Sequence, residues 1–418
     1  MDTIEQLIAW AGPKGVKLNG LGPQRMPGRG IGLVATREIQ PNEIVLEIPI
    51  ACLRTLDTVP KPLVRKLPPK MSVHGLLAAD LMLDGVNPSS EEHSRYAAWD
   101  AVCPTPEDLS TAPLLWPEEL QALLPRAARE LLDKQKAKFA KDWAGVRPVA
   151  VATAGGAEKD VASGSTSVNA SQQGTDDKDG DHEDEGLKAR YKHAWLLVNT
   201  RTFYYTNAKL KKRPRDDHMA LQPVADLFNH TDDDSVTCKV SFDYRGFSFR
   251  ASKIYNPGDE VHICYGRHGN DKLLVEYGFA MDENRWDEVV LDEVVLAKLD
   301  ESQRDVLEEF GFLGKYVLDR EGVCYRTQVA VRMLCCKHGE WRRFVDGADD
   351  GEATQEAVDL LVLGMLRESL STAATKIEEV GGMAVGRPEQ REMLVRRWKQ
   401  IYQILQTHIH RIVGKAQS

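Results

Sequence analysis

The pattern of hydrophobic and polar positions divides the chain into two β-rich parts, each followed by helices. Short apolar runs between turn residues predict strands at 31–36 and 43–48. The turn that joins them is too short for a crossover helix, so this start does not indicate a parallel doubly wound sheet. A short amphipathic helix over 2–10 precedes the strands, with Thr3 and Gln6 at the spacing of a capping box.

Helical spacing takes over from residue 60 to residue 145. The stretch 73–83 is apolar and unbroken, and Pro117 stands at the first position of a helix whose apolar residues recur as far as Trp143. A further helix is predicted at 187–200. Together these helices form an insert between the two β-rich parts.

Residues 150–187 are of low complexity and end in an acidic run. Such a segment has too few apolar side chains to offset the loss of chain entropy on folding, so it is predicted to be a disordered linker. A calcium-binding loop is the alternative for the acidic run. The run lacks the glycine and the closing glutamate at EF-hand spacing, which favours the linker.

The β pattern returns after residue 220. Strands predicted at 236–242 and 247–251 enclose a turn that contains a glycine, which is typical of a hairpin. The strand predicted at 260–265 alternates between apolar and polar residues and ends in a tyrosine. Asn270 is expected to cap a short helix over 270–277, which ends at a glycine.

The rest of the chain predicts a separate α-domain. Its predicted helices cover 293–310, 325–337, 354–371 and 388–413. A helical array can bind another protein, but a purely structural bundle has the same sequence pattern. Cys335 and Cys336 are expected to pack in the core rather than bind a metal, and His408 and His410 are expected on the surface of the last helix.

Composition and charge narrow the class of protein. A chain of 418 residues that is 42% hydrophobic and 28% charged is typical of a soluble globular protein with roughly two to three domains. A net charge of -9 argues against general nucleic-acid binding and suits a locally basic protein partner. The basic cluster at 209–215 permits a nuclear signal, but a solvated loop is the favoured interpretation.

Targeting signals also limit where the protein is expected to act. The chain has no apolar run of membrane-spanning length and no signal-peptide pattern at its N-terminus. Its seven cysteines are an odd number and are scattered, which indicates reduced thiols. We therefore expect the protein in the cytosol, the nucleus or both.

Candidate chemistry gathers at the apolar turn 225–230, which ends in Asn229 and His230. Alone, such a pair is typical of a capped turn, because Asn side chains bond readily to nearby backbone. Four further motifs occur elsewhere in the chain, and together with them the Asn-His pair indicates a functional site. They are Gly30-Ile31-Gly32, Thr200-Arg201-Thr202-Phe203, Tyr265-Gly266 and Glu276-Tyr277-Gly278-Phe279.

In this order the motifs resemble those of the SET-domain protein lysine methyltransferases, in the branch typified by the plant rubisco large-subunit methyltransferase. The resemblance covers nearly the whole chain apart from the acidic linker. It implies an α+β fold, in which a helical insert splits the SET-domain β-fold and an all-α substrate-binding domain follows. The expected boundaries are 1–58 and 206–287 for the SET domain, 59–205 for the insert and 288–418 for the C-terminal domain.

The resemblance implies methyl transfer from S-adenosyl-L-methionine to a lysine ε-amine in a non-histone protein, such as a ribosomal protein or a translation factor. Since the methyl donor is already activated, the protein must supply orientation, desolvation and a neutral amine. A lysine has an ordinary pKa of about 10.4, so a site of low dielectric must lower that pKa. The expected partner is a protein with a target lysine, and we expect a monomer without nucleic acid, membrane or metal.

The resemblance also implies a role for each motif residue. Tyr265 is the expected catalytic residue, whose hydroxyl polarises the methyl group and orients the amine lone pair. The expected substrate-binding residues are Asp226, Tyr277 and Phe279, with the two aromatic rings as channel walls that favour a cation. The expected cofactor-binding residues are Gly30, Ile31, Gly32, Arg201, Phe203, Asn229 and His230. His230 is thus an anchor for the cofactor rather than a base.

Two other interpretations stay open. One branch of the family methylates a histidine in actin, and no local motif here distinguishes that acceptor from lysine. A catalytically silent SET fold that only binds proteins is the alternative from another class, and the presence of Asn229, His230 and Tyr265 argues against it. The sequence also lacks the cysteine triplets of histone-type enzymes, so the helical tail must replace their zinc-bound segment.

Overall fold

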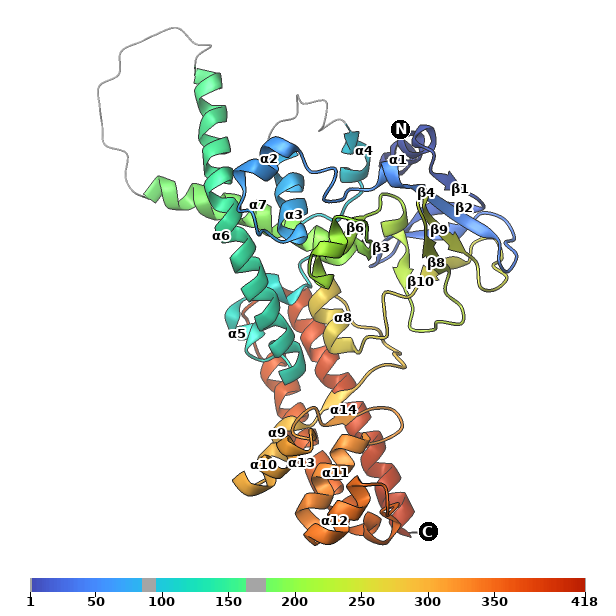
Figure 1. Cartoon of the computed structure of the whole chain (residues 1–418), viewed down its shortest axis with the longest axis vertical. Coiled ribbons are helices and arrows are strands. Elements are labelled where there is room, and N and C mark those ends of the chain that lie inside the picture. The colour runs from blue at the N-terminus through green and yellow to red at the C-terminus, as the bar shows by residue number, and fades with distance from the viewer. Residues whose placement is uncertain (1, 85–94, 163–177, 418) are drawn as a thin grey trace. The chain divides into compact units, whose positions relative to one another are not determined.

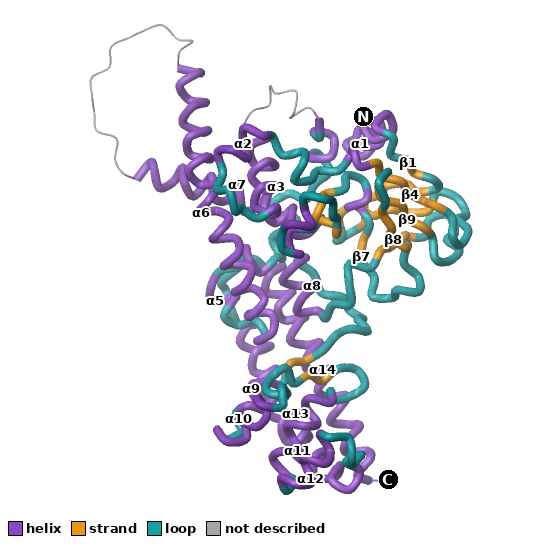
Figure 2. The backbone as a smooth tube through the Cα atoms, in the orientation of Figure 1, coloured by secondary structure: helices purple, strands orange, loops and turns teal. Residues whose placement is uncertain are grey.

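The computed structural model describes residues 2–84, 95–162 and 178–417 (Figure 1). The chain forms two compact units, which are cut at other places than the expected domain boundaries. The first contains Met1–Leu109 and Lys134–Tyr265, and the second contains Ser110–Asp133 and Gly266–Ser418. Figure 2 shows that the first unit mixes helices with most of the strands, whereas the second is almost wholly helical.

Two four-stranded sheets form most of the β part of the first unit. One sheet has the order β1 (Lys17–Leu18), β4 (Ile44–Pro49), β9 (Gly246–Arg250), β8 (Lys239–Phe242). The other has the order β2 (Leu21–Met26), β3 (Gly30–Ala35), β10 (Glu260–Ile263), β7 (Asn229–His230). The predicted strands at both β-rich parts are confirmed, and the first two of them, β3 and β4, belong to different sheets.

Strand β10 is the element that gathers the motifs. It pairs with β3 in an antiparallel direction on one side and with β7 in a parallel direction on the other. Val261 and Ile263 are buried while His262 is partly exposed, which confirms the predicted alternation. The glycine motif and the Asn-His pair therefore flank the strand that leads to Tyr265.

The helical insert packs around an aromatic core within the first unit. Helices α3 (Val73–Asp84) and α7 (Lys178–Arg201) lie against each other, and α6 (Arg126–Ala162) contributes its residues beyond Asp133. The Trp195 ring meets Phe139 edge to face at 5.8 Å, and its Nε1 donates to Asp142 Oδ2 at 3.1 Å. The other helices of this unit are α1 (Thr3–Ala11), α2 (Lys61–Lys66), α4 (Ala97–Asp100) and the short helices η1 (Gly12–Lys14), η2 (Ile50–Cys52), η5 (Leu210–Lys212), η6 (Arg215–Asp217) and η7 (Ala225–Leu227). The helices predicted at 73–83 and 187–200 are confirmed.

The prediction of a disordered linker over 150–187 is wrong at both ends of that range. Helix α6 continues to Ala162 and α7 begins at Lys178, so both ends of the predicted linker are helical. Both helices extend from well-packed segments, and tertiary packing rather than local propensity supplies most helical stability. Residues 163–177 lie outside the described part of the chain.

The second unit is built on two long helices, α13 (Gln355–Gly381) and α14 (Pro388–Gln417), which pack against each other. Its other helices are α5 (Glu118–Gln121), α8 (Asn270–Tyr277), α9 (Asp292–Leu296), α10 (Glu301–Glu309), α11 (Tyr325–Cys335), α12 (His338–Val345) and the short helices η4 (Pro113–Leu115) and η8 (Glu352–Thr354). A short strand pair joins β11 (Val289–Val290) to β12 (Val317–Leu318). The predicted α-domain is confirmed. The helix expected at 293–310 is two helices, because Asp300 caps a new one with Gln303. Within the described residues, every helix is too short or too polar to cross a membrane.

Several local predictions are wrong. The capping box of α1 is Asp2 with Glu5 rather than Thr3 with Gln6. Gly269 rather than Asn270 precedes α8, because the Asn270 side chain is buried and donates to the Met281 carbonyl and to Gln400, both at 3.0 Å.

Two surface and core assignments in the second unit are also wrong. His408 is buried, with 5% of its surface exposed, whereas Cys335 is exposed at the end of α11. Cys335 is the last residue of α11, whereas the backbone of Asp319 hydrogen-bonds the His408 side chain. Helical spacing alone predicts neither environment.

A buried histidine in the insert links stability to pH. His74 Nε2 lies 2.9 Å from the Trp195 carbonyl oxygen, and the two rings stack at 4.0 Å. A carbonyl only accepts, so Nε2 carries the proton of a neutral ring. Burial lowers the pKa of His74 from 6.5 to about 3. Between these two pKa values, the unfolded chain binds a proton at His74 and the folded chain does not. Stability that is present above pH 6.5 is therefore lost as the pH falls toward 3.

We predict that His74→Gln reduces this acid sensitivity, because a glutamine Nε2 still donates but does not titrate. Between pH 6 and pH 4 the wild type should lose about 1.4 kcal/mol more unfolding free energy per pH unit than the variant. Urea unfolding at several pH values measures the difference. Parallel pH profiles for the two proteins would contradict the assignment.

Candidate functional site

A carboxylate on β10 orients the side chain of Asn229. Asn229 Nδ2 donates to Glu260 Oε1 at 2.7 Å, and Arg29 Nη2 lies 2.8 Å from Glu260 Oε2. His262 Nε2 is 3.4 Å from the same carboxylate, whose side chain is only 12% exposed. Since the amide nitrogen faces Glu260, the Asn229 Oδ1 faces the other way, where it can accept a hydrogen bond.

The two glycines of the strand opening are needed for different reasons. A β-carbon on Gly32 would lie 2.8 Å from Glu260 Oε1 and 2.9 Å from Asn229 Nδ2, closer than real contacts allow. Gly30 has open space around it, but its φ of 72° is a conformation that favours glycine. The glycine strand thus lies directly against the Asn229 turn.

The turn that precedes Asn229 is strained. Val224, a buried and β-branched residue, has a φ of 78°, and the short helix η7 follows it. Such a conformation is a true outlier for valine and is typical of functional turns. The Asp226 amide donates to the Gln222 carbonyl at 3.0 Å, which closes the turn.

His230 and Tyr265 hold each other in place. The Tyr265 backbone amide donates to His230 Nδ1 at 3.1 Å, and the two rings stack with centroids 5.0 Å apart. The Tyr265 hydroxyl donates to the Phe228 carbonyl at 2.6 Å. Because Nδ1 accepts, the neutral ring carries its proton on Nε2. This geometry suits the anchoring role predicted for His230 and fixes the hydroxyl of Tyr265 at the turn.

The partly buried Arg201 side chain forms an ion pair with the fully buried carboxylate of Asp226. Arg201 Nη1 donates to the Asp226 carbonyl oxygen and to Asp226 Oδ2, both at 3.0 Å. Trp99 Nε1 donates to the same carboxylate oxygen at 2.9 Å. Burial raises the pKa of the Asp226 carboxyl, and Arg201 and Trp99 partly oppose that rise. Burial alone would lower the pKa of Arg201, but Asp226 together with neighbouring groups opposes it, and the pKa is raised.

Two contributors to the site were not predicted, Glu260 and Trp99. Trp99 lies on α4 in the insert, and the Arg54 guanidinium lies over its ring at 5.8 Å and over the Tyr96 ring at 4.5 Å. Arg54 in turn bonds Asp80 Oδ2 at 2.9 Å. No spacing rule links these residues to the 225–230 turn, because they meet only in the folded chain.

Of the remaining predicted residues, Phe203 and Ile31 belong to the first unit, and Tyr277 and Phe279 belong to the second. Phe203 sits on β5 (Thr202–Tyr204), which pairs with β6 (Met219–Leu221), and its ring meets Phe249 edge to face at 6.1 Å. Ile31 is half-buried on β3. Tyr277 and Phe279 belong to the second unit, with ring centroids 6.2 Å apart. Their contact with cofactor or substrate stays a prediction.

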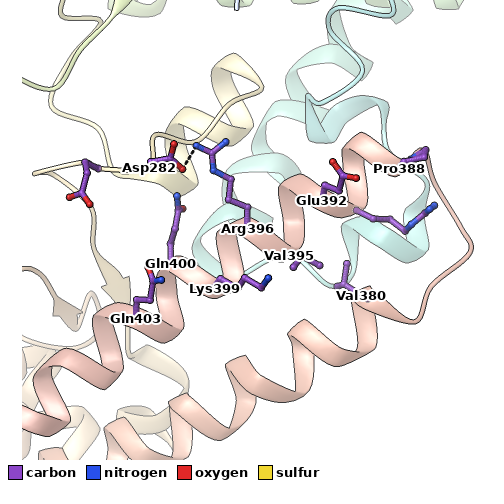
Figure 3. A pocket seen from close by; sticks show the side chains of 12 residues that line it. Asp282, Val380, Pro388, Glu392, Val395, Arg396, Lys399, Gln400 and Gln403 are labelled. Atoms are coloured by element: carbon purple, nitrogen blue, oxygen red, sulfur yellow. Dashed lines mark hydrogen bonds and ion pairs between the residues drawn. The ribbon is translucent and has the colours of Figure 1, made fainter. Parts of the chain in front are cut away.

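A pocket in the second unit does not coincide with the predicted site. It has a volume of about 680 Å³ and lies along α14, where Arg396 bonds Asp282 (Figure 3). The described residues that line it include none of the predicted site residues. Across the described part of the chain, no three His, Cys, Asp or Glu side chains gather closely enough to hold a metal ion.

Comparison with known proteins gives the family. The SET-domain family model matches residues 30–266. The chain belongs to the SET-domain family. The C-terminal domain of ribosomal lysine N-methyltransferase 2 is a second family model that matches, over residues 287–411. The expected family and the α+β fold class are confirmed.

Individual relatives within the SET-domain family are distant. The chain is 29% identical over 209 residues to ribosomal lysine N-methyltransferase set11 of Schizosaccharomyces pombe, which is 47% of this chain and 53% of the relative. It is 24% identical to human SET domain-containing protein 4 over 84% of this chain and 77% of that protein. The first alignment thus spans about half the length of the relative.

A solved structure has the same fold. The SET domain of LSMT bound to lysine and AdoHcy superposes with a TM-score of 0.61 at 16% identity, covering 100% of this chain and 92% of that chain. At this identity the match establishes the fold rather than the activity.

We predict that Gly32→Ala destabilises the first unit by about 1–3 kcal/mol, as overpacking does. The added carbon meets Glu260 and Asn229, and neither atom moves easily because they bond each other. Gly12→Ala is the matched control, since Gly12 has an ordinary helical φ of -55° and open space around it. Thermal unfolding compares the two variants, and equal midpoints would contradict the close packing described here.

Proposed function

We propose that this protein is an S-adenosyl-L-methionine-dependent protein-lysine N-methyltransferase that acts on a non-histone protein. The observation that carries the proposal is the cluster around β10, where Gly32, Asn229, His230 and Tyr265 meet in the order that the family motifs require. Membership of the SET-domain family supports a methyltransferase, and the second matched family model supports lysine as the acceptor.

A ribosomal protein is the substrate class that we propose first. The family model of the second unit and the relative from Schizosaccharomyces pombe both carry the name of a ribosomal lysine methyltransferase. Ribosomal proteins are rich in lysine, and the net charge of -9 of this chain suits such a basic partner. Such a substrate is met in the cytosol and the nucleus, which we propose as the places of action.

The residues of the cluster fit a cofactor with an amino-acid end. The missing side chain of Gly32 leaves backbone close to Asn229, and the Asn229 Oδ1 is oriented to accept from an ammonium group. We propose that Gly30, Ile31 and Gly32 contact the cofactor through main chain, while Asn229, His230, Arg201 and Phe203 complete its site. When bound, the cofactor supplies an activated methyl group on a positively charged sulfur.

The protein itself orients the lysine amine and excludes water from it. The Tyr265 hydroxyl is fixed by its bond to the Phe228 carbonyl and by the His230 ring. From that place it can orient the lone pair of an amine, and the carbonyl groups of the turn can accept from the amine hydrogens. Exclusion of water lowers the pKa of a lysine from its ordinary value of about 10.4 and so favours the reactive neutral form.

We predict that Tyr265→Phe lowers methyl transfer at least about 100-fold, as loss of one positioned hydrogen-bond group does. Binding of S-adenosylhomocysteine should stay close to that of the wild type, because the hydroxyl acts on the methyl group and the amine. Tyr244→Phe is the control, since Tyr244 is 84% exposed and removal of its hydroxyl should change neither quantity.

The assay uses labelled cofactor and ribosomal proteins from cells that lack this protein, followed by mass spectrometry of the labelled site. Methyl groups on histidine instead of lysine would favour the histidine-modifying branch. A wild type that binds cofactor but labels no protein would favour a silent binding module. Equal labelling by wild type and Tyr265→Phe would contradict the role given to Tyr265.

A further inference from the structure

The ion pair of Arg201 and Asp226 has a feature that its structural role does not explain. The Asp226 side chain has no exposed surface, and both hydrogen bonds to its carboxylate, from Trp99 and Arg201, go to Oδ2. Oδ1 is also buried, and within the described residues it has no hydrogen-bond partner. A buried carboxylate is costly unless its charge is matched, and here one guanidinium matches it.

The pair lies at the same turn as the hydroxyl of Tyr265. Arg201 bonds the Asp226 carbonyl, and Tyr265 bonds the carbonyl of Phe228, two residues further along. Arg201 and Tyr265 thus bond the backbone of the same turn from two different elements. An amine held by Tyr265 and these carbonyls would therefore lie within the electrostatic reach of both members of the pair.

We propose that the Arg201–Asp226 ion pair sets the pH at which a lysine amine bound at this turn loses its proton. An unpaired carboxylate would raise the pKa of the lysine and so favour the ammonium ion, whereas an unpaired guanidinium would lower that pKa and favour the free amine. Because the charges of the two residues cancel, the pair has little net effect on the pKa of the lysine. Desolvation then lowers that pKa and favours the free amine. This inference rests on the function proposed above.

The chemical step that depends on this deprotonation is balanced. The ammonium releases its proton to solvent water, which frees the nitrogen lone pair. That pair forms the new nitrogen–carbon bond, and the electrons of the broken sulfur–carbon bond stay on sulfur. The ion pair exchanges no proton with the amine and acts only through its charge.

Other charged or titratable groups also face the pair. Arg54 is matched by carboxylates, with bonds to Asp80 and Asp84 and an approach of 3.6 Å to Asp100. Burial raises the pKa of the Cys103 thiol, which faces Arg201 and Asp226, so the thiol stays neutral. These groups and Tyr265 are the same in every variant below, so differences between variants report on the pair alone.

The test is the pH profile of kcat, whose acidic limb reports the ionisation of the enzyme–substrate complex. Arg201→Gln leaves the carboxylate unmatched and should move this limb to higher pH by about one unit or more. Asp226→Asn leaves the guanidinium unmatched and should move it to lower pH by a similar amount. The double variant is neutral again, so its limb should return close to the wild-type position even if kcat is lower.

Trp99→Phe and Arg201→Lys are the matched controls, because they change hydrogen bonds but not charge. Both should leave the acidic limb near its wild-type position. If Arg201→Gln does not fold, a comparison of the two single variants Arg201→Lys and Asp226→Asn still tests the proposal, because only Asp226→Asn changes a charge. Unshifted limbs in all active variants, or shifts of the same sign in both single variants, would overturn it. A wild type that transfers no methyl at any pH would instead refute the proposed function, and this inference with it.

Discussion

The site of the first unit depends on the parallel pairing of β7 with β10. This pairing sets Asn229 beside His262 and His230 beside Ile263. It brings the Asn229 amide to Glu260 and the His230 ring to the backbone of Tyr265. Because side chains alternate along a strand, a slip of one residue would turn each of these groups to the opposite face. Gly32 on β3 permits this arrangement, since any side chain there would collide with it.

Buried ion pairs hold elements in position in both units. In the first, Arg201 matches Asp226 at the turn that leads to Asn229. In the second, Arg397 is wholly buried and bonds Asp271 and Asp287, both at 2.7 Å, which ties α14 to α8. Loss of one partner from such a pair typically costs about 3–5 kcal/mol, because the other charge is left buried and unmatched. These pairs therefore fix geometry, and the pair in the first unit also controls the charge that a bound amine would meet.

Local sequence signals predicted the elements and most of the cluster. Glycine spacing, strand alternation and helix periodicity gave β3, β10 and α8, because each depends on neighbours in the chain. The order of the motifs led to the family and so to Asn229, His230 and Tyr265. The family match confirms the fold class, while the role of each site residue stays a prediction.

Contacts between distant segments could not be predicted in the same way. Trp99 and Asp226 are 127 positions apart, and no composition or spacing rule links them. Asn270 has the residue type of a helix cap, but partners on α14 and beyond α8 bury it. His408 was misjudged for the same reason, since burial depends on what packs against a helix as well as on the helix itself.

The central claim is that an acceptor lysine meets Tyr265 at the turn of Asp226 and Phe228. A crystal structure with S-adenosylhomocysteine and a lysine tests it most directly. We predict the lysine nitrogen within about 3.2 Å of the Tyr265 hydroxyl and of a carbonyl of this turn, with the cofactor against Gly32 and Asn229. A lysine or cofactor bound elsewhere, with the β10 cluster unchanged and empty, would contradict the account.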